Sequence, residues 1–125
     1  MGDFKALESS MADIDFSTFQ VYTMSISSSA GLIGKNSINT ILSVLVYRNG
    51  KAITAQELTE GVLRWYEDGV LLPVDDSRIS DSGFTFTTGT LTVGHTYKCE
   101  LQDNLAEIET TLEIVSDGTQ GPQGP

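Results

Sequence analysis

Short runs of alternating apolar and polar residues, separated by turn-forming pairs, constrain this chain more than any other feature. In the run from Glu107 to Val115, every second residue would face inward: Ile108, Thr110, Leu112 and Ile114. This period of two is typical of a half-buried β-strand. Asn49-Gly50 and Asp68-Gly69 are strong hairpin-turn pairs. Some seven or eight such runs predict an all-β sandwich or barrel.

The strongest predicted strand is Ile38–Arg48, because apolar residues occupy both of its faces. That pattern predicts a central strand. A first strand is expected over 20–27, with a loop after it at 27–31. Two further strands are expected at 84–87 and 91–93, separated by Thr88-Gly89-Thr90.

The chain of 125 residues is long enough for one domain with one hydrophobic core. We expect a linker or helix end at 1–19, a β-sandwich at 20–116 and a tail at 117–125. The first part has apolar residues at helical spacing: Phe4, Leu7, Met11 and Ile14. Thr54 and Glu57 match a helix capping box, so a short helix remains open in the 54–61 loop.

The charge balance argues against several partners. The net charge is −10, whereas nucleic-acid binding needs a basic face and attachment to anionic lipid needs basic residues. We therefore expect no nucleic acid and no membrane as partners. No signal peptide and no apolar run of transmembrane length is visible. Cys99 is the only cysteine, so no intramolecular disulfide can form, which fits folding in a reducing cytosol.

Residues for catalysis or metal binding are sparse, and we expect no enzyme activity, no cofactor and no metal. His95 is the only histidine and follows a glycine in a predicted corner. Asp75, Asp76 and Asp81 could converge on a calcium ion, but they lack a regular ligand spacing and are better explained as solvated loop acids.

Three further features together resemble a known family. Trp65-Tyr66-Glu67-Asp68-Gly69 looks like the W-Y-x-D-G segment of immunoglobulin-like domains in bacterial and phage surface proteins. Tyr97-Lys98-Cys99 resembles the Y-x-C of the sixth immunoglobulin strand. The tail at 118–125 has glycine at every third position, as collagen requires. The combination is similar to minor tail or fibre proteins of phages that infect Gram-positive bacteria.

This resemblance implies an immunoglobulin-like antiparallel sandwich of seven to eight strands. Trp65 would cover Cys99 and an aliphatic residue of the second strand, either Leu42 or Val44. Cys99 would then act as a small buried hydrophobe rather than a reactive thiol. The Tyr97 hydroxyl would bond to the backbone a few residues upstream, near 92–94.

The implied role is a spacer or accessory binder, found in the virion or on an extracellular surface. Its partners would be other subunits or domains of a fibre. The chain would be a fragment with a disordered tail that stays monomeric, and its parent would be a trimer through the collagen-like stalk. The alternative is a carbohydrate-binding module for bacterial surface polysaccharide. Its candidate ligand-binding residues are Tyr22, Tyr47 and Tyr66; a coplanar exposed pair would favour this alternative, and scattered rings would favour the spacer.

Overall fold

The structure is a computed structural model that describes residues 20–58 and 62–116. The predicted N-terminal helical segment at 1–19 and the collagen-like tail at 117–125 lie outside the described residues, as does the end of the 54–61 loop. Within that loop, the Thr54 amide donates to Glu57 Oε1 (2.8 Å) and the Glu57 amide donates to Thr54 Oγ1 (3.2 Å). The capping box therefore forms on a turn at 55–57.

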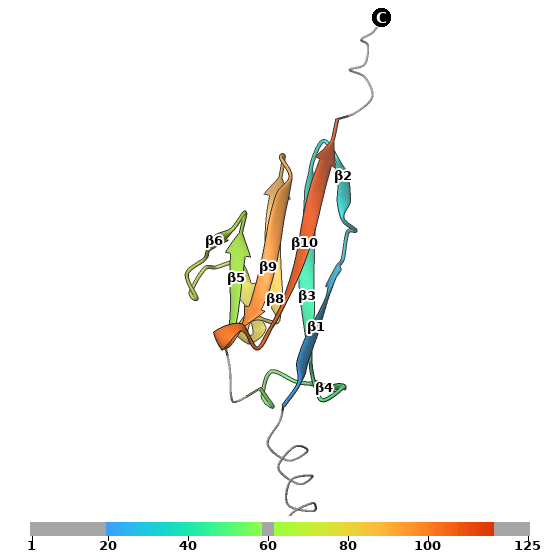
Figure 1. Ribbon diagram of the computed structural model, residues 1–125. Coiled ribbons are helices and arrows are strands. Elements are labelled where there is room, and N and C mark those ends of the chain that lie inside the picture. Colours follow the sequence, from blue (N-terminus) through green and yellow to red (C-terminus); the bar gives the residue numbers. More distant parts are fainter. Residues whose placement is uncertain (1–19, 59–61, 117–125) are drawn as a thin grey trace, which may run out of the picture.

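Two sheets packed face to face form a β-sandwich, which confirms the predicted fold class (Figure 1). The first sheet has the order β1-β3-β8-β7, with β4 paired to the end of β3: β1 (Tyr22–Ser28), β3 (Ile38–Arg48), β4 (Lys51–Ile53), β7 (Ile79–Ser80) and β8 (Thr85–Leu91). The second has the order β2-β10-β9-β5-β6: β2 (Ile33–Lys35), β5 (Leu63–Glu67), β6 (Val70–Leu71), β9 (His95–Leu101) and β10 (Ala106–Val115). The described part has no α-helix, only the 3₁₀ turns η1 (Asp81–Gly83) and η2 (Gln102–Asn104).

The strand order is that of an immunoglobulin sandwich. β1-β3-β8-β7 corresponds to the A-B-E-D sheet, and β10-β9-β5 to the G-F-C sheet, with β6 added at its edge. The described residues contain ten strands rather than seven or eight, because the unexpected strands β2, β4 and β7 are only two or three residues long. Runs this short carry too little periodicity to be separated from loops in the sequence.

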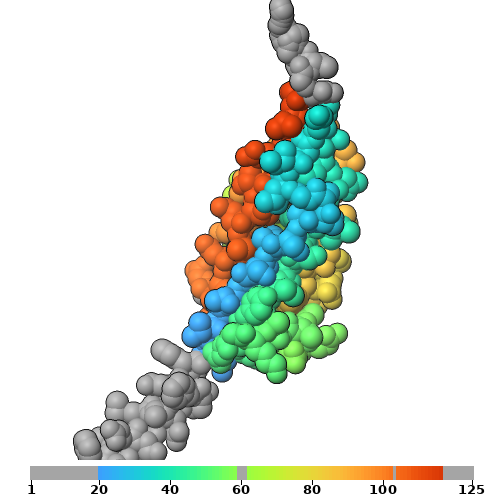
Figure 2. All heavy atoms as spheres, turned by 90° about the vertical axis from the view of Figure 1, so that its right-hand side faces the viewer, coloured from blue at the N-terminus to red at the C-terminus, as the bar shows by residue number. Residues whose placement is uncertain are grey.

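The strand β2 is the main element that the sequence did not predict. It runs parallel to β10, with Ile33 opposite Glu113 and Lys35 opposite Val115, whereas every other strand pairing among the described residues is antiparallel. Figure 2 looks onto this edge, where the edge strands β1 (blue) and β2 (cyan) run beside β10 (orange to red). β1 therefore packs against both β3 and β10, which belong to different sheets.

Both predicted hairpin turns are present. Asn49 and Gly50 have φ of 54° and 83°, and Asp68 and Gly69 have φ of 52° and 83°. Positive φ at both central residues defines the type I′ turn, whose twist matches that of the flanking strands.

Each turn also holds a strand that lies outside its own hairpin. The Asn49 amide donates to Val21 O (2.7 Å), and the Val21 amide donates back to Asn49 Oδ1 (2.9 Å). In the same way, the Asp68 amide donates to Thr96 O (2.7 Å), and the Thr96 amide donates to Asp68 Oδ1 (2.9 Å). The two turns thus fix the start of the first strand and the start of β9.

The predicted break at 88–90 is wrong, because β8 continues through it to Leu91. Gly89 has a φ of 72°, and the register against β3 shifts between Asn39 and Ile41. The Thr88 hydroxyl accepts from the Thr40 amide (3.1 Å) and lies within hydrogen-bonding distance of Thr40 O (3.2 Å). A side chain thus supplies the bonds that the irregular backbone lacks, and the strand survives.

The central strand β3 lies between β1 and β8, but only one of its faces is buried. Leu42, Val44 and Val46 point into the core with 0–2% of their surface exposed. Ile41 and Leu45, on the outer face, are 42% and 49% exposed. Apolar residues on both faces therefore predicted the central position correctly, although the outer face is open to solvent rather than covered.

Candidate functional site

The centre of the sandwich is built around Trp65 on β5. Its side chain is fully buried, and its Nε1 donates to Gly83 O (2.8 Å). Cys99 lies opposite it on β9, and Leu42 and Val44 are buried on the facing sheet. The structure thus brings together the four residues that the immunoglobulin resemblance placed in one cluster.

The ring that stacks on the indole belongs to Phe86, which is absent from the predicted core set. The centroids of Trp65 and Phe86 lie 4.9 Å apart, and Phe86 in turn lies 5.1 Å from Tyr97. The three rings form a continuous aromatic column across both sheets. The alternation of phenylalanine and threonine from Phe84 to Thr87 is the signal that could have placed Phe86 there.

The structure corrects the expected partner of Tyr97. The ring is fully buried, but its hydroxyl donates to Glu67 Oε2 (2.7 Å) rather than to the backbone near 92–94. Glu67 is the last residue of β5 and pairs with Tyr97 on β9, so its carboxylate lies within hydrogen-bonding distance of the hydroxyl and takes the place of the backbone acceptor. Burial, together with this bond, raises the pKa of Tyr97 above its ordinary value.

A small ionic network lies at the Tyr97 end of the aromatic column. Arg78 Nη1 lies 3.1 Å from the same Glu67 oxygen, while Arg78 Nε and Nη2 each donate to Asp76 at 3.0 Å. The bidentate hydrogen bonds from Arg78 lower the pKa of Asp76. The guanidinium carbon also lies 5.1 Å from the Phe86 ring centroid. The network is absent from the predicted set, although Arg78 is the only cation in an acidic loop.

Cys99 sits among these core residues with none of its surface exposed. Burial raises the pKa of its thiol well above the ordinary range. A nucleophilic cysteine needs a lowered pKa and access to solvent. Cys99 therefore has the surroundings of a packing residue.

The three tyrosines proposed as sugar-binding residues do not form one surface. Tyr22 is buried, with 9% of its surface exposed. Tyr47 and Tyr66 are half-buried and lie on β3 and β5, which belong to different sheets. The Tyr66 ring is covered by Lys98 Nζ, 4.3 Å from its centroid, and its hydroxyl donates to Glu100 Oε1 (2.7 Å).

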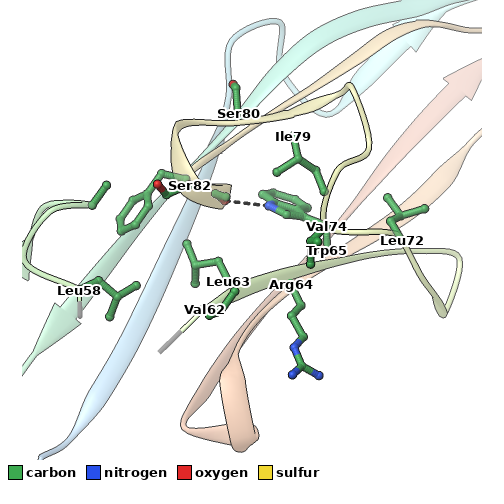
Figure 3. A pocket seen from close by; sticks show the side chains of 13 residues that line it. Leu58, Val62, Leu63, Arg64, Trp65, Leu72, Val74, Ile79, Ser80 and Ser82 are labelled. Atoms are coloured by element: carbon green, nitrogen blue, oxygen red, sulfur yellow. Dashed lines mark hydrogen bonds between the residues drawn. The ribbon is translucent and has the colours of Figure 1, made fainter. Parts of the chain in front are cut away.

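A groove of about 440 Å³ opens between β5 and the 72–84 segment. Figure 3 shows its side chains, with the Arg64 guanidinium pointing away from the groove. Most of its lining side chains are aliphatic or aromatic, and two serines add hydroxyl groups: Leu58, Val62, Leu63, Leu72, Val74, Ile79, Phe84, Ser80 and Ser82. Arg64 is the one charged residue among the described lining residues, so the groove holds no pair of acid and base for proton transfer.

Two of the remaining candidate residues, His95 and Asp76, have side-chain partners. His95 Nδ1 lies 2.6 Å from Asp68 Oδ2. The Thr96 amide bond to Asp68, and then this contact with His95, lower the pKa of Asp68. Of Asp75, Asp76 and Asp81, Asp76 is occupied by Arg78. Within residues 20–58 and 62–116, no three His, Cys, Asp or Glu side chains gather as a metal site would require.

The described part of the chain contains no helix of the length and hydropathy needed to cross a membrane. The chain matches no known protein-family profile and no curated protein. Its function therefore has to be inferred from the geometry described above, together with the residues that carry the sequence resemblance.

Proposed function

We propose that this chain is a structural, non-catalytic module of a phage tail fibre or a similar surface fibre. It would act as a spacer and a weak accessory binder at the bacterial surface. The observation that supports this most is the path of the chain: β1 begins at one end of the sandwich and β10 finishes at the opposite end (Figure 1). A domain entered and left at opposite ends lengthens the fibre in which it is inserted.

The strand β2 suits a module that carries load between these two ends. The Glu113 amide donates to Leu32 O and the Asn36 amide donates to Val115 O, both at 2.8 Å. These bonds join β2 to the last residues of β10 and lie across the direction in which the two ends would be pulled. Tension would load them together rather than one after another.

The expected partners follow from the tail sequence and its resemblance. Gly-x-y triplets after the sandwich would continue as a stalk of three chains in the parent protein, beside other fibre subunits. The location would be the virion or another extracellular surface. A core that contains an unpaired, buried cysteine, Cys99, would allow folding in a reducing cytosol before assembly.

The positions of the tyrosines favour the spacer over a carbohydrate-binding module. Sugar faces stack on exposed flat rings, and Tyr47 and Tyr66 are on opposite sheets while Tyr22 is buried. Weak contacts repeated over three chains would still give avidity that a single copy lacks.

The test is a pull-down of labelled protein on Gram-positive cells and on purified wall polysaccharide. A single copy is compared with a version fused to an unrelated trimerisation segment. Retention by neither version supports a pure spacer, and retention of the trimer alone supports the accessory-binding role. Tight retention of the single copy that is lost in Tyr47→Ala or Tyr66→Ala would replace the proposal with a carbohydrate-binding module. Release of new reducing ends from the polysaccharide would overturn the non-catalytic assignment.

A further inference from the structure

The outer surface of the first sheet differs in chemistry from the rest of the described molecule. We call it the neutral face, and it comprises the outward residues of β1, β3 and β8: Thr23, Ser25, Ser27, Asn39, Ile41, Ser43, Leu45, Tyr47, Thr85, Thr87 and Thr90. None of these residues is charged, in a chain whose net charge is −10. Apart from Asn39, they are hydroxyl-bearing or apolar residues.

The outer surface of the second sheet, in contrast, carries many charged side chains. Its outward residues on β10 include Glu107, Glu109 and Glu113, and Lys98 and Arg64 lie beside them on β9 and β5. This surface carries charges of both signs, and Lys98 Nζ lies 3.6 Å from Glu107 Oε1, so two copies meeting through it would have to desolvate charged groups. The neutral face offers an approach that avoids this cost.

The neutral face also has an apolar ridge along its centre. Ile41 and Leu45 are 42% and 49% exposed, and they flank Ser43 symmetrically along β3. Hydroxyl side chains border this ridge: Ser27 and Thr85 lie opposite Ser43 on the two neighbouring strands. The outer face of a half-buried antiparallel sheet is ordinarily polar, so two exposed aliphatic residues at its centre depart from the expected pattern.

We propose that the neutral face binds the neutral face of a second copy of this chain. A two-fold axis in the interface, passing beside Ser43, would set Ile41 of each copy against Leu45 of the other. The ridge is self-complementary under this operation, as a two-fold interface requires. The bordering hydroxyls could bond to one another across the interface without any charge being desolvated.

A sugar chain is a poorer occupant of the same surface. Tyr47 is the only ring on the neutral face and is half-buried, so no pair of rings is available for stacking. An anionic polymer would find no cation on the neutral face. A second copy satisfies both the apolar ridge and the absence of charge.

The size of the surface sets the strength of the contact. Three strands of this length present roughly 300 Å² at the usual strand spacing and rise. Stable complexes bury about 800 Å² on each partner, so the contact should be weak. A free copy would be monomeric in dilute solution, and pairing would appear at concentrations of about 1 mM or between tethered copies. This inference does not depend on a fibre role.

The experiment follows backbone amide chemical shifts and sedimentation as the protein is concentrated from about 50 μM to about 1 mM, the effective range of tethered modules. Shift changes should be confined to β1, β3 and β8, and the average mass should rise. Ile41→Lys and Leu45→Glu should each weaken the association at least tenfold. Val70→Lys is the matched control, because Val70 is 65% exposed on the edge strand β6 and should leave association unchanged.

A mixture of Ile41→Lys and Leu45→Glu proteins tests the orientation. In the proposed dimer, one contact then pairs the introduced lysine with the introduced glutamate, and the other remains Leu45 against Ile41, so mixing should restore association. Unfolding curves of all variants establish that they are folded. The proposal fails if the shifts do not change with concentration, if Val70→Lys weakens association equally, or if mixing restores nothing. It also fails if dilute protein shows the same shifts on addition of wall polysaccharide, because a glycan is then the occupant.

Discussion

At the scale of single residues, one carboxylate links the aromatic column to the ionic network. Glu67 Oε2 accepts from the Tyr97 hydroxyl and pairs with Arg78, which also binds Asp76. A buried phenol without an acceptor would leave its donor unsatisfied, which costs about 1–3 kcal/mol. The network therefore explains how Tyr97 can be fully buried without the backbone bond that the family resemblance implied.

Removing this hydroxyl should destabilise the fold measurably. Tyr97→Phe loses a hydrogen bond to a charged acceptor and should lower the free energy of unfolding by about 1–2 kcal/mol. Tyr66→Phe is the matched control, because the Tyr66 hydroxyl also donates to a glutamate but lies on the outer face of its sheet. It should cost clearly less stability than Tyr97→Phe does. Urea unfolding of both variants decides the matter, and equal losses would contradict the role given to Glu67.

The buried thiol should make the protein sensitive to alkali. The pKa of Cys99 is higher in the folded protein than in the unfolded chain, so its contribution to stability is complete below about pH 8.5 and is lost as the pH rises further. The loss approaches about 1.4 kcal/mol per pH unit. Tyr97, whose pKa is also raised, adds a similar loss only above about pH 10.

Cys99→Ala separates this effect from the packing of the thiol. The variant should be less stable at pH 7 by about 1–2 kcal/mol, because it leaves a small cavity. Its stability should nevertheless change little between about pH 8 and about pH 9.5, where that of the wild type declines. Thermal unfolding across this range tests the expectation, and parallel curves for the two proteins would count against it.

At the scale of secondary-structure elements, β2 depends on one close approach. A Cβ on Gly34 would lie 2.7 Å from the Ile38 Cβ and would also meet the backbone of Ser37. Gly34→Ala should therefore displace β2 from β10 and lower stability by about 2–3 kcal/mol. Gly94→Ala is a milder comparison, because its nearest contact would be Leu112 O at 3.0 Å. Hydrogen exchange at the Glu113 and Asn36 amides would report the loss of pairing, and unchanged protection in Gly34→Ala would refute it.

Long strands with clear alternation and turns with a characteristic residue pair were predictable from the sequence. The strand from Ile38 to Arg48 has the expected bounds, and both type I′ turns follow from Asn-Gly and Asp-Gly. β2 was not predictable, because three residues around a glycine have no strand signal and pair only through a distant partner. The continuity of β8 depends on the Thr88 side chain meeting Thr40, a contact that local pattern does not encode.

In the central cluster, too, some residues were predictable from the sequence and others were not. Trp65 and Cys99 belong to recognisable sequence motifs, and both are buried as those motifs predicted. The Glu67–Arg78 pair joins residues from β5 and the 72–84 segment, so only the folded arrangement reveals it. The neutral face was predictable only in part: the sequence showed apolar residues on both faces of β3, but it did not show that one of these faces is exposed to solvent.

At the scale of the whole molecule, the proposed spacer role predicts a dependence on the direction of force. Pulled from its two ends, the sandwich should resist until the β2–β10 bonds fail together. Pulled between Val70 and the C-terminal end of β10, it should yield at lower force, because β6 pairs with β5 through only two residue pairs at a sheet edge and can peel away. Single-molecule extension in both geometries tests this, with Gly34→Ala as the weakened comparison. Equal forces in the two directions would argue against a load-bearing design.

Because its only cysteine is unpaired, the domain has no covalent loop that would limit its extension. Once the last pairing gives way, the entire sandwich could uncoil into a tether of roughly 300 Å. When the pull slackens, the same strands could reform. A series of such domains would unfold one after another under a brief load, which lengthens the fibre in steps, and would refold when the load is removed.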